Sequence, residues 1–373
     1  MVIAVPRESA LKERRVALVP ETVARFVKSG VGVCMQRGAG AAAAFPDGLY
    51  AAAGATFADD AESLARDADV LVTVGRPGDD VLGVLRPGSV VVGFLNPLGD
   101  PEYGRRLAER GLTALAMEMI PRITRAQSMD ALSSQSNIAG YKAVLLAAAA
   151  LPKFFPMLTT AAGTIPPAKV LVLGAGVAGL QAIATARRLG AVVSAYDTRA
   201  VVKEQVQSLG ATFLEFDLGV DAEGAGGYAK ELTPEQQERQ RAWMVEQIGK
   251  NDVVITTALV PGRRAPILIS EAAIAAMKPG SVIVDLAAEA GGNAALTKPN
   301  ETIVTDNGVT IIGMTNLAST MPYNASQLYS RNVHALLSPF IKDGALALDF
   351  DDDVIKGACI TRDGQALLGG AAS

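Results

Sequence analysis

The sequence has few of the side chains that usually carry acid–base, metal or disulfide chemistry, with one histidine and two cysteines among 373 residues. Cys34 and Cys359 lie far apart and form neither a CxxC pair nor a disulfide framework, which is typical of a protein from a reducing compartment. His334 lies in RNVHALL, a segment whose pattern predicts a helix remote from every motif, so we interpret it as an ordinary surface or core residue. We therefore predict no metal site.

Excess charge of one sign and long hydrophobic runs are also scarce. The net charge of -4 supplies no basic surface, which argues against nucleic acid as a partner. The longest apolar run, residues 143–151, is about half of what a membrane-spanning helix needs, and the N-terminus lacks the pattern of a secretory signal. The sequence predicts a cytoplasmic chain without direct membrane insertion, whose membrane contact would go through a partner.

The residues that are abundant indicate the fold class. Half of the residues are hydrophobic but only 5% are aromatic, a composition typical of sheets covered by helices. Short apolar runs alternate with amphipathic segments, which predicts an α/β fold with two Rossmann-like doubly wound parallel sheets. The expected strands are 2–5, 31–36, 68–75, 89–95, 112–119, 169–174, 191–197, 252–259, 281–287 and 308–314. The expected helices include 21–30, 103–111 and 177–189.

The length predicts two domains with a cleft between them, since a single core seldom grows this large. We expect the first domain at 1–135, completed by the C-terminal tail from about 320 to 373, and the second at 136–319. A long alanine-rich helix over 133–151 should join the two domains. The glycine-rich, charged insertion at 219–240 is either a tolerated surface loop or a mobile lid.

A glycine-rich turn is the strongest functional signal. Gly174, Gly176 and Gly179 form GxGxxG directly after an expected strand and at the start of an expected helix. This context predicts a dinucleotide site in which the helix amides bind the pyrophosphate. Asp197 ends the next strand, where its carboxylate can bind a ribose hydroxyl and repel a 2′-phosphate. The motif favours NAD(H) over NADP(H), although the neighbouring Arg199 weakens that exclusion.

A polar segment at 121–137 lies between the two expected domains. One interpretation is a linker with helix caps. In the other, Arg122 neutralises phosphate while Gln127, Asp130 and Ser133 hold a carboxamide and a ribose by hydrogen bonds. Such groups would orient a nicotinamide without any acid–base role.

The reaction type follows from the shortage of bases. Oxidation of an amine or alcohol releases a proton and usually needs a base, whereas hydride transfer between two nicotinamides needs only close approach and orientation. Leu259, in TTALVPG after an expected strand, can pack on the cofactor or in an ordinary core.

Two long stretches, RAQSMDALSSQSNIAGYKAV and TAAGTIPPAKVLVLGAGVAGLQAIATARRLGA, closely resemble the NAD(H)-binding component of proton-translocating transhydrogenases, the alpha subunit's first domain. The resemblance runs over essentially the whole chain and places it in the alanine dehydrogenase/transhydrogenase superfamily. It implies that the nicotinamide site is formed by Arg122, Gln127, Asp130 and Ser133. It also implies further cofactor contacts, at Val177, Asp197, Thr198, Arg199, Gly227, Tyr228, Gln240 and Leu259.

The same resemblance implies the activity and the partners. The chain would hold NADH for direct hydride transfer to NADP⁺ on a partner component, coupled to proton translocation by a separate membrane component. Full activity would need these partner subunits. The family suggests a homodimer, peripheral on the inner face of the membrane through those subunits.

Alanine dehydrogenases are the nearest alternative, because they share TVGRPG and VVVGFLNPLG. They place a catalytic lysine and histidine where this chain has Gly75 and Asn96. Arg15 resembles their substrate-binding arginine, and we interpret it as structural. An alanine dehydrogenase-like NAD-dependent amino-acid dehydrogenase and a non-catalytic NAD-sensing module remain the alternatives.

Overall fold

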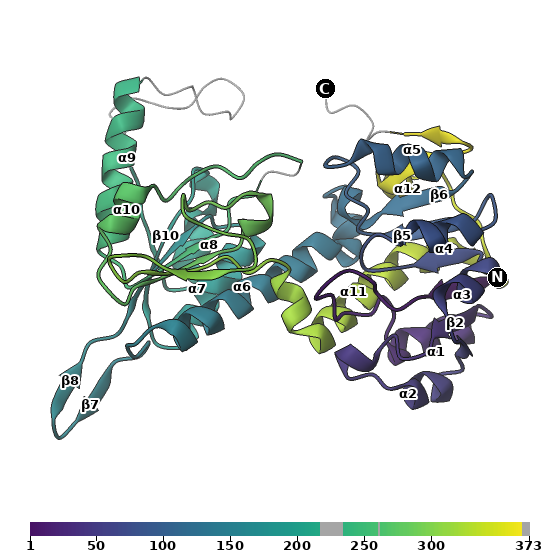
Figure 1. Ribbon diagram of the computed structural model, residues 1–373, viewed down its shortest axis with the longest axis horizontal. Helices are drawn as coiled ribbons and strands as arrows, with labels where there is room; N and C mark the ends of the chain where they lie inside the picture. Colours follow the sequence, from purple (N-terminus) through teal and green to yellow (C-terminus); the bar gives the residue numbers. More distant parts are fainter. Residues whose placement is uncertain (217–233, 260–261, 368–373) are drawn as a thin grey trace. The chain divides into compact units, whose positions relative to one another are not determined.

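The computed structural model describes residues 1–216, 234–259 and 262–367. The chain divides into two compact units, Met1–Ser136 with Ala318–Ser373 and Asn137–Leu317 (Figure 1). Each unit is built on a mostly parallel sheet with helices packed on it, which confirms the predicted α/β class.

The first unit contains an eight-stranded sheet of order β19-β18-β6-β5-β4-β1-β2-β3. Its strands are β1 (Val2–Val5), β2 (Gly32–Gln36), β3 (Thr56–Ala58), β4 (Val70–Val72), β5 (Val90–Gly93), β6 (Thr113–Ala116), β18 (Cys359–Arg362) and β19 (Gln365–Ala366). Strands β1 to β6 are parallel, whereas the C-terminal β18 and β19 continue the sheet in antiparallel pairing. The chain reverses its direction of strand addition between β1 and β4, so their carboxyl ends form the switch point of this sheet.

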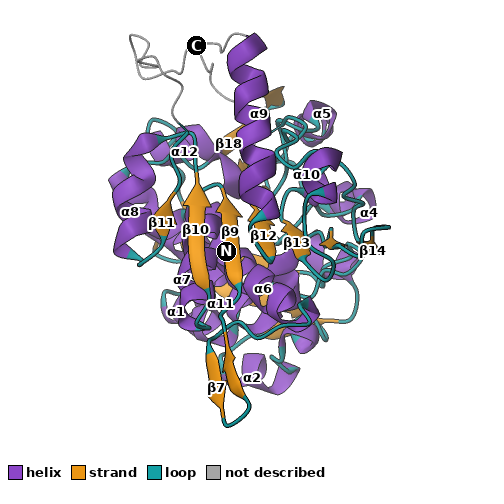
Figure 2. Cartoon of the chain, turned by 90° about the vertical axis from the view of Figure 1, so that its left-hand side faces the viewer, coloured by secondary structure: helices purple, strands orange, loops and turns teal. Residues whose placement is uncertain are grey.

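The second unit contains a seven-stranded sheet of order β11-β10-β9-β12-β13-β15-β14 (Figure 2). Its strands are β9 (Lys169–Leu173), β10 (Val192–Tyr196), β11 (Thr212–Phe213), β12 (Val253–Thr256), β13 (Val282–Asp285), β14 (Thr302–Val304) and β15 (Thr310–Ile312). Only β14 is antiparallel within this sheet. Its switch point lies between β9 and β12, where a ligand of an open α/β sheet is expected.

The core explains why β9 forms in the centre of this sheet. Val170 and Val172 belong to a hydrophobic cluster on one face, and Leu171 and Leu173 to a cluster on the other. All four are fully buried, and each such side chain contributes about 1.5–3 kcal/mol relative to exposure. A strand that is apolar on both faces requires helices on both sides, as in other parallel sheets.

Helices cover both sheets. In the first unit these are α1 (Pro20–Lys28), α2 (Asp47–Ala52), α3 (Ala61–Arg66), α4 (Asp79–Val84), α5 (Pro101–Glu109), α11 (Pro322–Leu337) and α12 (Asp353–Ala358). In the second unit these are α7 (Val177–Arg188), α8 (Lys203–Ser208), α9 (Pro234–Gly249) and α10 (Glu271–Ala275). The long helix α6 (Ala131–Ala150) begins in the first unit and continues into the second.

Several sequence predictions need correction. Residues 234–240 are helical rather than part of a loop, because α9 begins at Pro234, a residue favoured at the first helical position. The strand expected at 112–119 is shorter, since β6 ends at Ala116 and a 3₁₀ turn follows at Met117–Met119. The hairpin of β7 (Leu158–Thr160) and β8 (Gly163–Ile165) was not expected, and it extends away from the second sheet (Figure 1, Figure 2).

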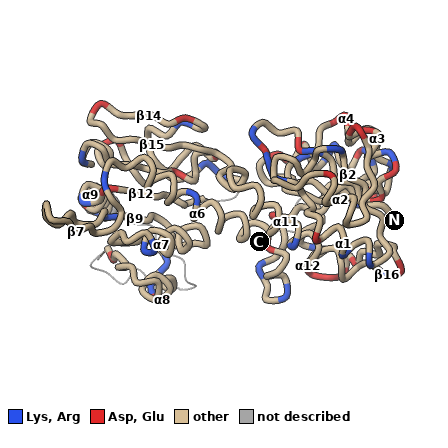
Figure 3. Tube along the Cα trace, turned by 90° about the horizontal axis from the view of Figure 1, so that it is seen from below, with Lys and Arg blue, Asp and Glu red and all other residues tan. Residues whose placement is uncertain are grey.

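The surface carries mixed charge. Figure 3 shows Lys and Arg positions interspersed with Asp and Glu positions in both units. Over the parts of the chain that the structure describes, no helix combines the length and the apolar character that crossing a bilayer requires.

Candidate functional site

The glycine-rich turn follows β9 at the switch point of the second sheet. Gly174 has φ +99°, a left-handed conformation that favours glycine. Thr257, just after the neighbouring β12, donates from Oγ1 to the carbonyl oxygens of Gly174 at 3.1 Å and Leu173 at 3.3 Å. A Cβ at Gly174 would collide with that hydroxyl, so Thr257 and Gly174 fix the turn together. Sequence reasoning did not identify Thr257.

The turn opens helix α7. Gly176 is the N-cap residue, and no heavy atom lies within 4 Å of the Cβ position built on it. Gly179, one turn later, lies directly on the carbonyl oxygen of Gly174, where any side chain would clash. The helix therefore starts close to β9, with its first amides and the positive end of its dipole beside open space. These residues suit the pyrophosphate of a dinucleotide.

A second close approach supports the same helix from behind. Gly140, inside α6, lies on the backbone of Ala178, and a Cβ at Gly140 would collide with the Ala178 carbonyl oxygen. Both residues belong to the second unit. The start of α7 is thus fixed by Gly140 on one helix and Gly179 on the other. Nothing in the local sequence of α6 distinguishes Gly140, because only the packed structure reveals the contact.

Asp197 directly follows β10 and contacts the turn. Its carboxylate accepts hydrogen bonds from the backbone N–H of Ala175 at 2.7 Å and that of Arg199 at 2.8 Å. The Arg199 guanidinium donates two more, from Nε at 3.0 Å and Nη2 at 2.9 Å. Burial raises the pKa of Asp197, but these bonds outweigh it and hold the pKa below its ordinary value. Asp197 is therefore an anion at neutral pH, where a ribose hydroxyl would meet it.

The remaining contacts expected in this unit lie at the same edge or close to it in sequence. Gln240 on α9 donates from Nε2 to the Tyr196 hydroxyl at 2.9 Å, next to Asp197 in the chain. Val177 is 40% exposed at the start of α7, and Leu259 is 52% exposed after β12. Leu259 is thus not a core residue, which favours the cofactor interpretation over ordinary packing. Thr198 is half-buried between Asp197 and Arg199 in the chain.

A buried carboxylate orders the segment in which Leu259 lies. Asp285, at the end of β13, accepts from Thr256, Ala287, Asn293, Ala294 and Thr297. Asn293 in turn bonds both the N–H and the C=O of Ala258. The segment after β12 is therefore anchored through side chains that sequence reasoning overlooked. They lie in KPGSVIVDLAAEAGGN, where the alternation of apolar residues indicated only a strand.

The polar segment belongs to the first unit. Asp130 caps α6, since its carboxylate accepts from the Ser133 backbone N–H at 2.9 Å and the Ser133 hydroxyl at 2.6 Å. Gln127 lies in a 3₁₀ turn, Thr124–Met129, and both Gln127 and Arg122 are exposed. The structure thus brings Asp130 and Ser133 together as a helix cap and leaves Arg122 and Gln127 accessible. Gly227 and Tyr228 lie outside the described residues.

The first sheet places other groups at its switch point. Glu8, after β1, accepts from the backbone N–H of Val74 at 2.6 Å and Gly75 at 3.1 Å. Burial raises the pKa of Glu8 to about 7. Gly75 provides no lysine, and Asn96 has φ +51° and donates its backbone N–H to Glu118. Sequence reasoning missed Glu8, a carboxyl that titrates near neutral pH.

Arg15 lies in a buried network of the first unit. It donates to Glu13 at 2.6 Å and 2.8 Å and to Gln135 Oε1 at 2.9 Å. Its side chain is 8% exposed. These bonds agree with its interpretation as structural. His334 lies in α11 with its ring 5.0 Å from that of Phe26, and burial lowers its pKa.

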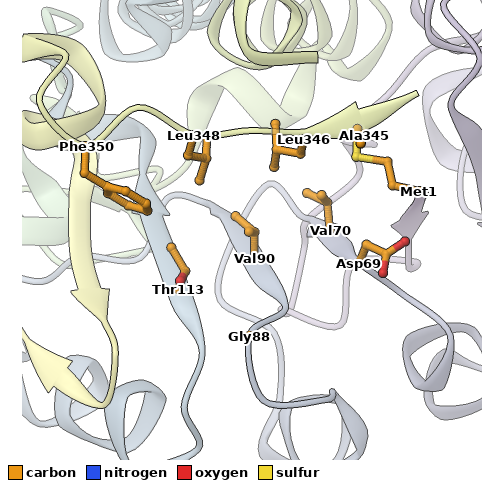
Figure 4. A pocket seen from close by; sticks show the side chains of 10 residues that line it. All are labelled: Met1, Asp69, Val70, Gly88, Val90, Thr113, Ala345, Leu346, Leu348 and Phe350. Carbon is orange, nitrogen blue, oxygen red and sulfur yellow. The ribbon is translucent and has the colours of Figure 1, made fainter. Parts of the chain in front are cut away.

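The largest cavity found in the described chain lies elsewhere. It has a volume of about 410 Å³ and lies at the amino ends of β4, β5 and β6. Leu346, Leu348 and Phe350 face Val70 and Val90 across it (Figure 4). Ligands of open parallel sheets bind at the carboxyl ends of the strands, so this cavity is not the candidate site.

Comparisons with known proteins match both units. The family model described as alanine dehydrogenase/PNT, N-terminal domain matches residues 4–139, and the one described as alanine dehydrogenase/PNT, C-terminal domain matches residues 143–368. The first of the separate polypeptides that form the NAD(P) transhydrogenase subunit alpha of Rhodospirillum rubrum is 48% identical, over 98% of each chain. The solved transhydrogenase of Sinorhizobium meliloti is 44% identical, covers 98% of this chain and all of its own, and has a TM-score of 0.88. A solved L-alanine dehydrogenase is 25% identical, with coverage of 98% and 97% and a TM-score of 0.79.

Proposed function

Because the chain belongs to the alanine dehydrogenase/PNT family, we propose that it is the NAD(H)-binding component of a proton-translocating transhydrogenase. The observation that carries the proposal is the site at the switch point of the second sheet. There, Asp197 is hydrogen-bonded to a glycine turn that opens α7. The 48% identity to a transhydrogenase subunit along nearly the whole of both chains favours this activity over others in the family.

In this proposal the second unit binds the cofactor. The amides that follow Gly174, Gly176 and Val177 hold the pyrophosphate, Gly179 keeps the helix close, and Asp197 with Thr198 and Arg199 contacts the adenosine ribose. Leu259 packs on the cofactor, and Gln240, Gly227 and Tyr228 complete the contacts. The negative charge of Asp197 favours NAD(H) over NADP(H).

Arg122, Gln127, Asp130 and Ser133 orient the nicotinamide. When bound, NADH supplies the hydride from C4 of its nicotinamide to NADP⁺ on the partner component. The four side chains need only bind and orient, because this transfer moves no proton and requires no base. The Asp130–Ser133 pair is suited to this task, since its bonds already fix both side chains at the start of α6.

The chain acts with partners. A separate component binds NADP(H), and a membrane-spanning component couples the transfer to proton translocation, so that this chain is peripheral to the membrane through them. We also propose a homodimer. Its support is the β7–β8 hairpin, where Met157 and Ile165 are 63% and 40% exposed, because an isolated two-stranded hairpin gains stability when its apolar side chains are covered.

The test compares NADH oxidation in two mixtures of the purified chain. One contains NADP⁺ and a matching NADP(H)-binding component, and the other contains pyruvate and ammonium. Oxidation only in the first mixture is expected. Oxidation in the second would instead make the chain an amino-acid dehydrogenase.

The second candidate is an alanine dehydrogenase-like enzyme, and one observation favours it. Glu8, with a pKa near 7, lies at the switch point of the first sheet beside Gly75 and could act as a base there. Glu8→Gln separates the two functions. It would abolish oxidation with pyruvate and ammonium if Glu8 were a base, and it should leave transfer to NADP⁺ intact.

A further inference from the structure

Arg199 occupies part of the site that a ribose needs. The Asp197 carboxylate accepts four hydrogen bonds, two on each oxygen, and two of them come from the Arg199 guanidinium. A carboxylate has about four lone-pair positions, so the guanidinium fills those that the backbone amides of Ala175 and Arg199 leave open. Ribose hydroxyls can reach the Asp197 oxygens only if the guanidinium moves away.

The two partners of this ion pair differ in freedom. The Asp197 side chain is 7% exposed and is bonded to two backbone amides, whereas the Arg199 side chain is 57% exposed. Exposed ion pairs are worth about 1 kcal/mol or less, so the guanidinium can leave while Asp197 stays in place. Lys203, the nearest other cation along the chain, is engaged with Glu215 at 2.7 Å. Arg199 is therefore the cation that responds to a nucleotide at this position.

Resting on the proposed function, we infer that Arg199 sets the discrimination between NAD(H) and NADP(H) by competing with the ribose for Asp197. For NADH, the guanidinium must be displaced before the 2′-hydroxyl can bond the carboxylate, which weakens binding. For NADPH, the same guanidinium neutralises Asp197 and can pair with the 2′-phosphate, which reduces the repulsion. Arg199 thus lowers a selectivity that Asp197 alone would make higher.

Arg199→Gln is the informative variant. It removes both guanidinium bonds, while the backbone N–H at position 199 and that of Ala175 still fix the carboxylate. Asp197 is then held in place with free acceptor positions. We expect NADH to bind at least as tightly as to the wild type, and the ratio of Kd for NADPH to Kd for NADH to rise about tenfold or more. Arg199→Lys keeps the charge without the fork, so its ratio should lie between the two.

The experiment measures Kd for NADH and NADPH by calorimetric titration of the full chain at several salt concentrations. Arg188→Gln is the matched control, since Arg188 is exposed at the opposite end of α7 and should leave both constants unchanged. A ratio for Arg199→Gln within twofold of wild type, or a loss of NADH binding, would overturn the inference while leaving the proposed function intact. Failure of the wild type to bind NADH would overturn both.

Discussion

The Asp197 carboxylate and the backbone N–H of Ala175 are 2.7 Å apart, so the acid after β10 is bonded to the glycine turn after β9. One side chain therefore both fixes the turn and presents the charge that selects the ribose. This dual role couples pyrophosphate and ribose recognition, and substitution of Asp197 should affect both.

Asp197→Ala should weaken NADH binding by roughly ten- to a hundredfold, the effect of losing hydrogen bonds to a charged group. Trp243 can report it, because it is the only tryptophan of the chain and its ring lies 5.2 Å from that of Tyr196, next to Asp197. The measurement is quenching of tryptophan emission on titration with NADH. Asp306→Ala, at an exposed turn of the same unit, is the control. Undiminished affinity of the Asp197 variant would refute the ribose assignment.

Gly140→Ala should destabilise the second unit. In a solvated helix this change adds about 0.5–1 kcal/mol of stability, because alanine restricts the unfolded chain. Here the new methyl group would meet the Ala178 carbonyl oxygen, and such overpacking costs about 1–3 kcal/mol. The free energy of unfolding from urea denaturation should fall, and NADH affinity should fall with it as the start of α7 shifts.

Gly104→Ala provides the comparison. Gly104 lies inside α5, where a Cβ would meet no atom within 4 Å, so this variant should be as stable as the wild type or more stable. Equal effects of the two substitutions would contradict a steric role for Gly140.

The sequence was sufficient for the parts of the molecule that depend on local pattern. The alternation of apolar runs predicted the ten longer strands, and GxGxxG with a following acid predicted the turn at Gly174 and the place of Asp197. The three-residue strands of the β7–β8 hairpin are too short to show a period of two. The six-residue helices α2 and α3 likewise span less than two turns, so their periodicity is not informative.

The remaining features of the site depend on contacts between distant residues. The contact of Gly140 with Ala178 joins two helices, and the pKa of Glu8 depends on amides about 66 positions further along the chain. Asp197 was predicted from its spacing, but its pairing with Arg199 required side-chain geometry. A single sequence contains these residues without the packing that gives them their roles.

Glu8 should make stability depend on pH. Its pKa is about 7 in the folded chain and near 4.5 in an unfolded one, so the folded state binds a proton more tightly. The resulting stabilisation is complete below about pH 4.5, decreases as the pH rises through the range to about 7, and is lost above it. The free energy of unfolding should therefore decrease by up to about 3 kcal/mol across this interval because of Glu8 alone.

Urea denaturation of the wild type and of Glu8→Gln between pH 4.5 and 8.5 isolates this contribution. The variant should lose the pH-dependent part that Glu8 supplies, whereas Glu62→Gln, at an exposed position of α3, should follow the wild type. Parallel curves for the wild type and Glu8→Gln would show that Glu8 titrates normally.

The β7–β8 hairpin gives the proposed homodimer its test. Met157, next to β7, is 63% exposed, and an aspartate there should prevent burial of the hairpin against a second copy because a buried, unpaired carboxylate is strongly unfavourable. Met157→Asp is expected to sediment as a monomer in analytical ultracentrifugation at concentrations where the wild type is a dimer. Val304→Asp is the matched control, since Val304 is 68% exposed on β14 of the same unit and should leave the dimer intact. A monomeric wild type would refute the homodimer, and a dimeric Met157→Asp would place its interface away from the hairpin. NADH binding to the second unit should persist in the monomeric variant, because Asp197 and the glycine turn lie outside the hairpin.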